Sequence, residues 1–322
     1  YVAVYNVSGK FVSNPESTVF TGGWNRMSAH TEVMDHTFKS IRRPNNDILY
    51  AVAMLDLTHE PMILEIPAFD TDYASLMVTG YDNYVNIPLS TRHGDFQSRT
   101  RIMFHSQRSP GYDGTPIQRI NEYFETSGDY ITAILRVIPH ANDPQRYGKN
   151  LKAIDRVKVK YMSECMTGVA PPPRDPGEFP AYGTTDEDIF GTNLLEVMQF
   201  VFNHSTFDPG HEPDQELLAL YEPLGVVPGR EFDPDQVALI DHARFRAIAE
   251  EVAAEARAKI VDQEYVAANL PSLYLPQGEM DQELVTTLAI VGPAGLPAAE
   301  VVYPQITPAD GSPFNAQHDY VV

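Results

Sequence analysis

One polar turn near the start of the chain carries the side chains best suited to hold an anion: Arg42, Arg43, Asn45, Asn46 and Asp47. Either arginine could grip a carboxylate or phosphate in a bidentate fork, with the amides and Asp47 beside it. A structural reading competes, because Pro44 keeps Arg43 out of the helical region, while Asn and Asp stabilise turns. On that reading we expect a buried Asp47, whose replacement by Ala would cost about 2–4 kcal/mol.

Histidines offer a second kind of chemistry, metal binding. The candidates for a metal site are His93, Asp95 and His105. His30 and His36 are six residues apart, which matches neither a helical pair nor one face of a strand. The spacing alone therefore demands no metal, and the sequence identifies no cofactor.

Motifs for nucleophilic or nucleotide-dependent catalysis are not found. The chain has no G-x-S-x-G elbow, no Walker loop and no G-x-G-x-x-G. Its single cysteine, Cys165, can form no intramolecular disulfide and precedes a proline-rich stretch without an obvious histidine partner.

The charge distribution separates two chemically different parts. Residues 1–165 carry 17 basic and 18 acidic side chains, whereas the rest carries 6 and 26, and the whole chain has a net charge of -21. Such an excess of negative charge repels phosphate backbones, so we expect no nucleic-acid partner. No apolar run reaches the roughly 20 residues of a membrane-spanning helix.

Short apolar runs separated by turns predict strands over most of residues 41–161, which implies a sandwich or barrel. A short helix at Ile117–Phe124 would be the exception. The proline-rich stretch at 167–183 predicts a linker.

Beyond that stretch, start signals and three-and-four spacing predict helices. The first follows Thr185 and includes 194–202. A long helix begins at Asp233, its packed stripe formed by Phe245, Ile248, Val252, Ala256 and Ile260. A third covers 282–291, and 299–303 returns to strand.

Residues 42–51, followed by Leu55-Asp56-Leu57 and 60–64, resemble the bacterial domain-of-unknown-function family 1254. The segment 224–233 is similar to the helical middle of such proteins, and 288–320 resembles the start of the partner family, 1214. The resemblance implies a multidomain α and β chain: a jelly-roll-like β-sandwich, a helical middle domain and the start of a second β-sandwich. Many members look exported, which implies a periplasmic or secreted protein.

These observations divide the chain into an N-terminal β-sandwich (1–166), a linker (167–183), a helical domain (184–278) and the beginning of a truncated second sandwich (279–322). Since the last residues alternate as in mid-strand, we expect a fragment. The favoured function is binding of a small molecule or glycan between domains. The alternatives are a metal-assisted enzyme that uses His and Asp residues of the first sandwich, and a structural or assembly protein. A homo-oligomer is compatible with the sequence.

Overall fold

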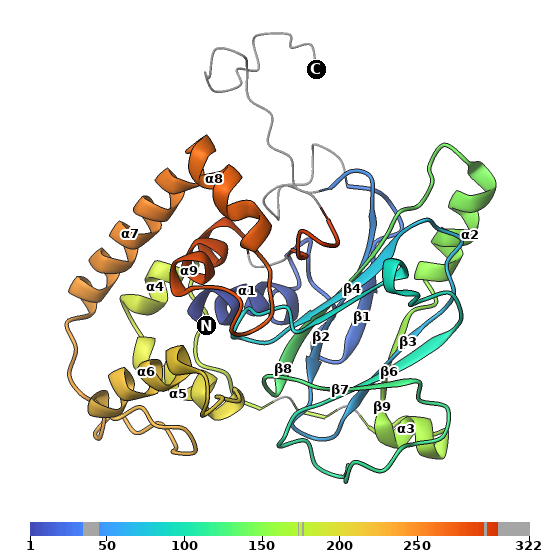
Figure 1. The fold of residues 1–322 in the computed structure, drawn as a ribbon. Helices are drawn as coiled ribbons and strands as arrows, with labels where there is room; N and C mark the ends of the chain where they lie inside the picture. Colours follow the sequence, from blue (N-terminus) through green and yellow to red (C-terminus); the bar gives the residue numbers. More distant parts are fainter. Residues whose placement is uncertain (35–44, 173, 176, 293–294, 302–322) are drawn as a thin grey trace.

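The computed structural model describes residues 1–34, 45–172, 174–175, 177–292 and 295–301. Two β-sheets occupy one side of the molecule and most helices gather on the other (Figure 1). The predicted combination of β-structure followed by helices is confirmed at this level.

Five strands form an antiparallel sheet in the order β1-β2-β8-β4-β5, and four form a second sheet in the order β7-β6-β3-β9. Strands β6 and β7 run parallel, and the other neighbours run antiparallel. The strands are β1 (Arg26–Ala29), β2 (Leu49–Asp56), β3 (Met62–Ile66), β4 (Ala74–Thr79), β5 (Ile87–Ser90), β6 (Thr100–His105), β7 (Glu122–Glu125), β8 (Tyr130–Val137) and β9 (Lys158–Tyr161).

Both sheets contribute to one apolar core. Alternate residues of β2, such as Leu49 and Leu55, meet Met62 and Leu64 of β3 and Phe104 of β6 there. Because side chains alternate across a strand, the remaining β2 and β8 residues face the opposite side of the five-stranded sheet. That second face is buried as well, which explains why β2 reads as a continuous apolar run.

The helices pack in different places: Phe11 and Leu288 lie on that second face, whereas Ile154 joins the shared core and Met162 packs on the four-stranded sheet. They are α1 (Val2–Val12), α2 (Pro144–Ile154), α3 (Met162–Thr167), α4 (Asp186–Phe190), α5 (Leu194–His204), α6 (Glu212–Tyr221), α7 (His242–Lys259), α8 (Gln263–Asn269) and α9 (Gln282–Val291), with short 3₁₀ turns at Thr91–His93, Glu222–Leu224 and Leu270–Ser272. Tyr5 of α1 is fully buried in a cluster with Val197 and Val201 of α5. The N-terminal helix therefore packs with the helical half.

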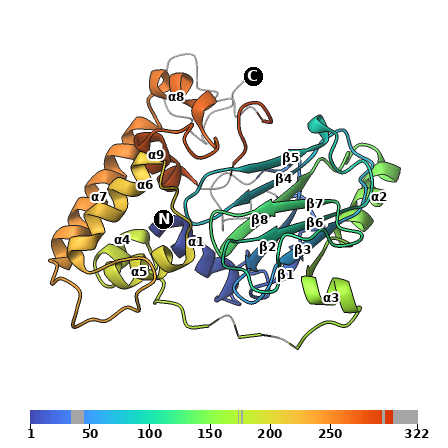
Figure 2. The ribbon, with the colours of Figure 1, turned by 60° about the horizontal axis from the view of Figure 1, so that its bottom comes forward.

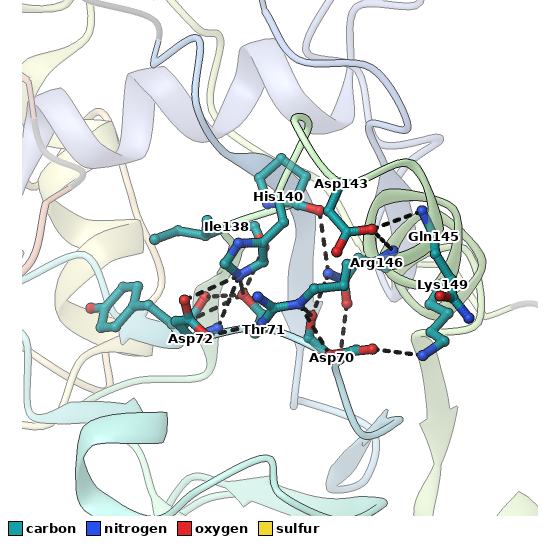
Figure 3. A network of polar contacts seen from close by, with 12 residues as sticks. Asp70, Thr71, Asp72, Ile138, His140, Asp143, Gln145, Arg146 and Lys149 are labelled. Carbon is teal, nitrogen blue, oxygen red and sulfur yellow. Dashed lines mark hydrogen bonds and ion pairs between the residues drawn. The ribbon is translucent and has the colours of Figure 1, made fainter.

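Helix α2 interrupts the predicted run of strands. Asp143 caps it by accepting the backbone N–H groups of Gln145 and Arg146, and Pro144 occupies its first turn. Figure 3 shows how Arg146 binds Asp70 and Asp72 of the turn before β4, with Nε–Oδ1 and Nη2–Oδ1 distances of 3.2 and 2.9 Å. These ion pairs fasten α2 to the β3–β4 connection.

The short helix expected at Ile117–Phe124 is not present. Its second half forms β7, which pairs with β6 through Ile102↔Glu122 and Phe104↔Phe124. The side chain of Phe124 packs on the shared core, so tertiary pairing overrides the local pattern.

The predicted start of the long helix at Asp233 is wrong. The carboxylate of Asp233 closes a local turn by accepting the N–H of Asp235, and the chain then folds back so that Ala238 N–H donates to the Leu224 carbonyl. Asp241 is the actual cap, because its Oδ1 accepts Arg244 N–H at 3.1 Å. The predicted stripe is right only in part: Ala256 is buried and Phe245 packs against the helical cluster, but Ile248 and Val252 are exposed.

Small residues form the buried face of α7. Ala253 and Ala256 are each 5% exposed, whereas Ile248 and Val252 are 48% and 40% exposed. The helix lies against α4 and α9. Alanines allow this close approach, which leaves two branched side chains in solvent.

The proline-rich segment runs from α3 along the lower edge of the molecule to the helical half (Figure 2). Its described residues contain no helix or strand before α4, but they are anchored: the Tyr5 hydroxyl donates to the Pro180 carbonyl, and Phe179 packs with the helices. Past α9, residues 299–300 form a turn where a strand was expected, and residues 302–322 lie outside the described residues. None of the described helices combines the length and apolar character needed to cross a bilayer.

Candidate functional site: the junction of the sheets and helices

The start of β8 meets the end of α5 in a short antiparallel contact. Gly128 and Ser205 form an isolated bridge, and Asp129 N–H donates to the His204 carbonyl at 2.8 Å. A Cβ atom on Gly128 would lie 2.6 Å from that carbonyl oxygen, so only glycine permits this approach. The contact brings Asp129 and His204 together; we call this place the junction site.

Three side chains donate to the buried carboxylate of Asp129. The Ser106 hydroxyl lies 2.6 Å from Oδ1, and Arg108 Nε lies 2.9 Å from Oδ2. His204 Nδ1 lies 2.9 Å from Oδ2. Burial alone would raise the pKa of Asp129, but these partners outweigh burial and lower it. Asp129 is therefore a fixed negative charge that orients His204.

The second ring nitrogen of His204, Nε2, is available to contact a ligand. Its side chain is 26% exposed and lies against the rings of Tyr130 and Phe200, with centroid distances of 4.9 and 4.6 Å. Among the described residues, Nε2 has no hydrogen-bond partner. A carboxylate on Nδ1 favours the tautomer with the proton there, which leaves Nε2 as an acceptor or base.

A second buried carboxyl, Asp56 at the end of β2, has the opposite electrostatic character. Burial raises its pKa, although the Thr58 hydroxyl and N–H donate to Oδ1 at 2.6 and 2.9 Å and oppose that shift. The His204 imidazole lies close enough to Asp56 to oppose this rise whenever the ring is protonated. Two carboxyls with pKa values moved in opposite directions can serve as acid and base in one site.

Aromatic rings lie next to this polar group: Trp24, Phe179 and Phe200 are half-buried, and Tyr130 is buried. Trp24 stacks on Phe179 at a centroid distance of 5.5 Å and an interplanar angle of 13°. It also contacts Tyr130, which in turn stacks on Phe200 of α5. The rings come from the loop before β1, the proline-rich segment, β8 and α5, so segments far apart in the chain assemble them.

The predicted anion-binding turn is placed only in part. Arg42 and Arg43 lie outside the described residues, and Asn45, Asn46 and Asp47 are exposed. The expectation that Asp47 is buried is wrong: its backbone N–H donates to Asn45 Oδ1 at 2.7 Å, so the Asn45 side chain closes the turn. The binding role of these five residues stays a prediction.

The candidate metal ligands are not gathered by the described part of the chain, which contains no cluster of three or more His, Cys, Asp or Glu side chains suited to a metal. His93 Nε2 lies 3.1 Å from Glu300, and Asp95 Oδ2 accepts Ser90 N–H at 2.9 Å. His105 instead packs its ring near Tyr112. Each of the three therefore has a separate local partner.

The junction residues escaped detection because no sequence spacing connects them. Asp129 stands immediately before a predicted strand and His204 shortly after a predicted helix, but 75 residues separate them. The one available signal was Gly128, a glycine at the entrance to a strand, which marks close approach of another backbone.

A solved structure resembles this fold. A crystal structure of the VPA0106 protein from Vibrio parahaemolyticus superposes with a TM-score of 0.60 at 21% identity, covering 79% of this chain and 58% of that chain. An uncharacterized protein from Burkholderia cenocepacia gives a TM-score of 0.30 at 14% identity over 54% and 49% of the two chains. This chain thus spans little more than half of the Vibrio protein.

No curated protein matches this chain significantly. Residues 24–161 match a family described as protein of unknown function, DUF1254, so the resemblance predicted for the N-terminal part is confirmed over that range.

Proposed function

We propose that this chain binds a small hydroxylated molecule, such as a sugar unit of a glycan, at the junction site. One observation carries the proposal: a carboxylate-oriented imidazole, His204, stands with its Nε2 unused by the described residues, beside half-buried aromatic rings. Binding sites commonly combine aromatic surface with a few fixed polar groups.

The chemistry of a sugar suits this combination. Trp24 and Phe200 supply ring surface for the apolar face of a pyranose, while His204 Nε2 can accept a hydroxyl proton. Asp56, buried and held by Thr58, adds a second polar group on the sheet side. The fixed charge of Asp129 keeps the imidazole in place without ligand, which reduces the entropy lost on binding.

Saturation-transfer NMR with a defined panel tests the proposal: glucose, galactose, N-acetylglucosamine and their disaccharides. We expect at least one saccharide to bind the wild type and the control His242→Gln, but not His204→Gln. The control histidine lies on α7 next to the Phe190 carbonyl. Absence of binding by the whole panel, or binding that survives His204→Gln, would refute the proposal.

Acid–base catalysis on the bound molecule is a second candidate, favoured by the opposite pKa shifts of Asp56 and Asp129. An Asp56→Asn variant that still binds the saccharide but no longer converts it would support this candidate. Equal conversion of the saccharide by the wild type and by Asp56→Asn would refute this candidate.

The finer architecture and the location of the protein also belong to the proposal. We take the two sheets as the jelly-roll-like β-sandwich of the DUF1254 resemblance, supported by their shared core and by the likeness to the Vibrio protein. The same resemblance supports a periplasmic or secreted protein. Cell fractionation of the source organism tests the location.

A further inference from the structure

A row of polar side chains crosses the face of the five-stranded sheet that is turned away from the shared core. In the strand register, Tyr50 of β2 lies opposite Arg136 of β8, Arg136 lies opposite Ser75 of β4, and Ser75 lies opposite Ser90 of β5. Directly opposed residues share a face, so these side chains form one line.

Arg136 is the unusual member of this row. It is only 7% exposed, and its Nη1 atom is buried with no hydrogen-bond partner among the described residues. Its guanidinium lies over the Tyr50 ring, 5.9 Å from the centroid. The Ser75 hydroxyl beside it is likewise buried without a hydrogen bond. A buried cation and a buried hydroxyl with unused donors are costly unless a ligand satisfies them.

One carboxylate already occupies the neighbourhood. Glu300 is 6% exposed, and its Oε2 accepts the Tyr73 hydroxyl at 3.2 Å. His93 Nε2 lies 3.1 Å from Oε1, and Arg92 Nη1 donates to the Glu300 carbonyl at 3.3 Å. Glu300 makes no ion pair with Arg136 in the described structure, so the guanidinium keeps its donors.

The charges indicate the ligand class. Arg92 and Arg136 carry two positive charges against the single negative charge of Glu300, so a monoanion would balance them, whereas a phosphate dianion would exceed them. The planar guanidinium fork also matches a planar carboxylate. Tyr73 remains a donor at neutral pH, since burial raises its pKa to about 12.

We propose that Arg136 and Ser75 bind the carboxylate of a small monocarboxylate on this sheet face, beside the Glu300 carboxylate. The site lies on different residues from the junction site and does not depend on the function proposed there. Glu300 has a definite part in it: its negative charge repels the bound anion and so lowers the affinity.

The test uses acetate as the probe. The dissociation constant of ¹³C-labelled acetate is measured by NMR titration at constant ionic strength with chloride as the balancing anion. Arg136→Gln should weaken acetate binding about tenfold or more, as expected when a charged hydrogen-bonding group is removed. The control Arg119→Gln removes the same charge from an exposed loop residue and should leave binding unchanged.

Two further variants keep the test decisive if Arg136→Gln does not fold. Arg136→Lys retains the charge but removes the planar fork, and Ser75→Ala removes one neutral donor; each should weaken binding about threefold or more. Glu300→Gln should tighten binding, an effect that a purely structural role of Arg136 would not produce.

Three results would overturn the proposal: no acetate binding by the wild type, equal binding by the wild type and the Arg136 and Ser75 variants, or weaker binding by Glu300→Gln. Binding of inorganic phosphate with no binding of acetate would refute the assignment to a monocarboxylate.

Discussion

His204 Nδ1 and Asp129 Oδ2 lie 2.9 Å apart across the junction of the sheets and helices, although 75 residues separate the two in the chain. The pair fastens the two halves and also fixes the ring that we propose contacts the ligand. The contribution of the Asp129–His204 pair to stability can be measured separately from its contribution to ligand binding.

Replacing Asp129 by Ala should destabilise the fold by about 3–5 kcal/mol, because Arg108 and Ser106 lose a buried acceptor along with His204. Chemical denaturation measures the free energy of unfolding. The exposed Asp47 is the matched control, and Asp47→Ala should change that free energy by less than about 0.5 kcal/mol. Equal losses for both variants would show that Asp129 does not hold the junction.

The buried carboxyl of Asp82 predicts a pH dependence of stability. Burial raises its pKa from 3.8 to about 6, so the folded protein binds the proton more tightly than the unfolded chain. The free energy of unfolding should therefore fall as pH rises from about 4 to about 6, by up to about 3 kcal/mol. Asp82→Asn should remove this component. A variant whose pH profile keeps the wild-type slope would contradict the assignment.

The ion pairs of Arg146 with Asp70 and Asp72 should hold α2 against the β3–β4 connection most strongly at low salt (Figure 3). Arg146→Met should speed hydrogen exchange of α2 amides, and the difference should shrink near about 1 M salt, where charges are screened within about 3 Å. Arg156→Met is the control, since Arg156 lies just past the end of α2 and its Nε donates only to the Lys152 carbonyl of that helix. Equal acceleration by both variants would count against the network.

The stability of the protein should fall when the buried alanines of α7 are enlarged, and it should tolerate changes at the exposed branched residues of that helix. Ala253→Leu should lower stability by about 1–3 kcal/mol because the larger side chain meets α4 or α9. Ile248→Ser should change it by less than about 0.5 kcal/mol. Thermal unfolding measures both. A larger loss of stability for Ile248→Ser than for Ala253→Leu would favour the packed stripe predicted from the sequence.

Local signals in the sequence predicted those elements whose ends are set by neighbouring residues. The helix at 282–291 has the predicted bounds, with Asp281 as its cap, and the helix predicted after Thr185 begins there, with Thr185 forming a capping box with Asp188. The predicted start of α7 was wrong because Asp233 and Pro234 resemble a helix start, whereas a backbone contact with Leu224 holds the following segment in a non-helical path.

Neither candidate site could be predicted in the same way. Arg136 appears in the sequence as one cation within a strand, and only the register with Tyr50 and Ser75 reveals its unused donors. The junction site depends on a backbone contact between β8 and α5, for which no local pattern codes. Contacts between residues far apart in the chain therefore form both candidate sites.

Trp24 provides the most direct test of the proposed function, because it is the single tryptophan of the chain and belongs to the junction site. Its fluorescence and its quenching by acrylamide are measured while the saccharide panel is titrated. We predict that a binding saccharide protects Trp24 from quenching in the wild type and in His242→Gln, and that the protection disappears in His204→Gln. Unchanged quenching with every saccharide, or equal protection in His204→Gln, would contradict a binding site at this junction.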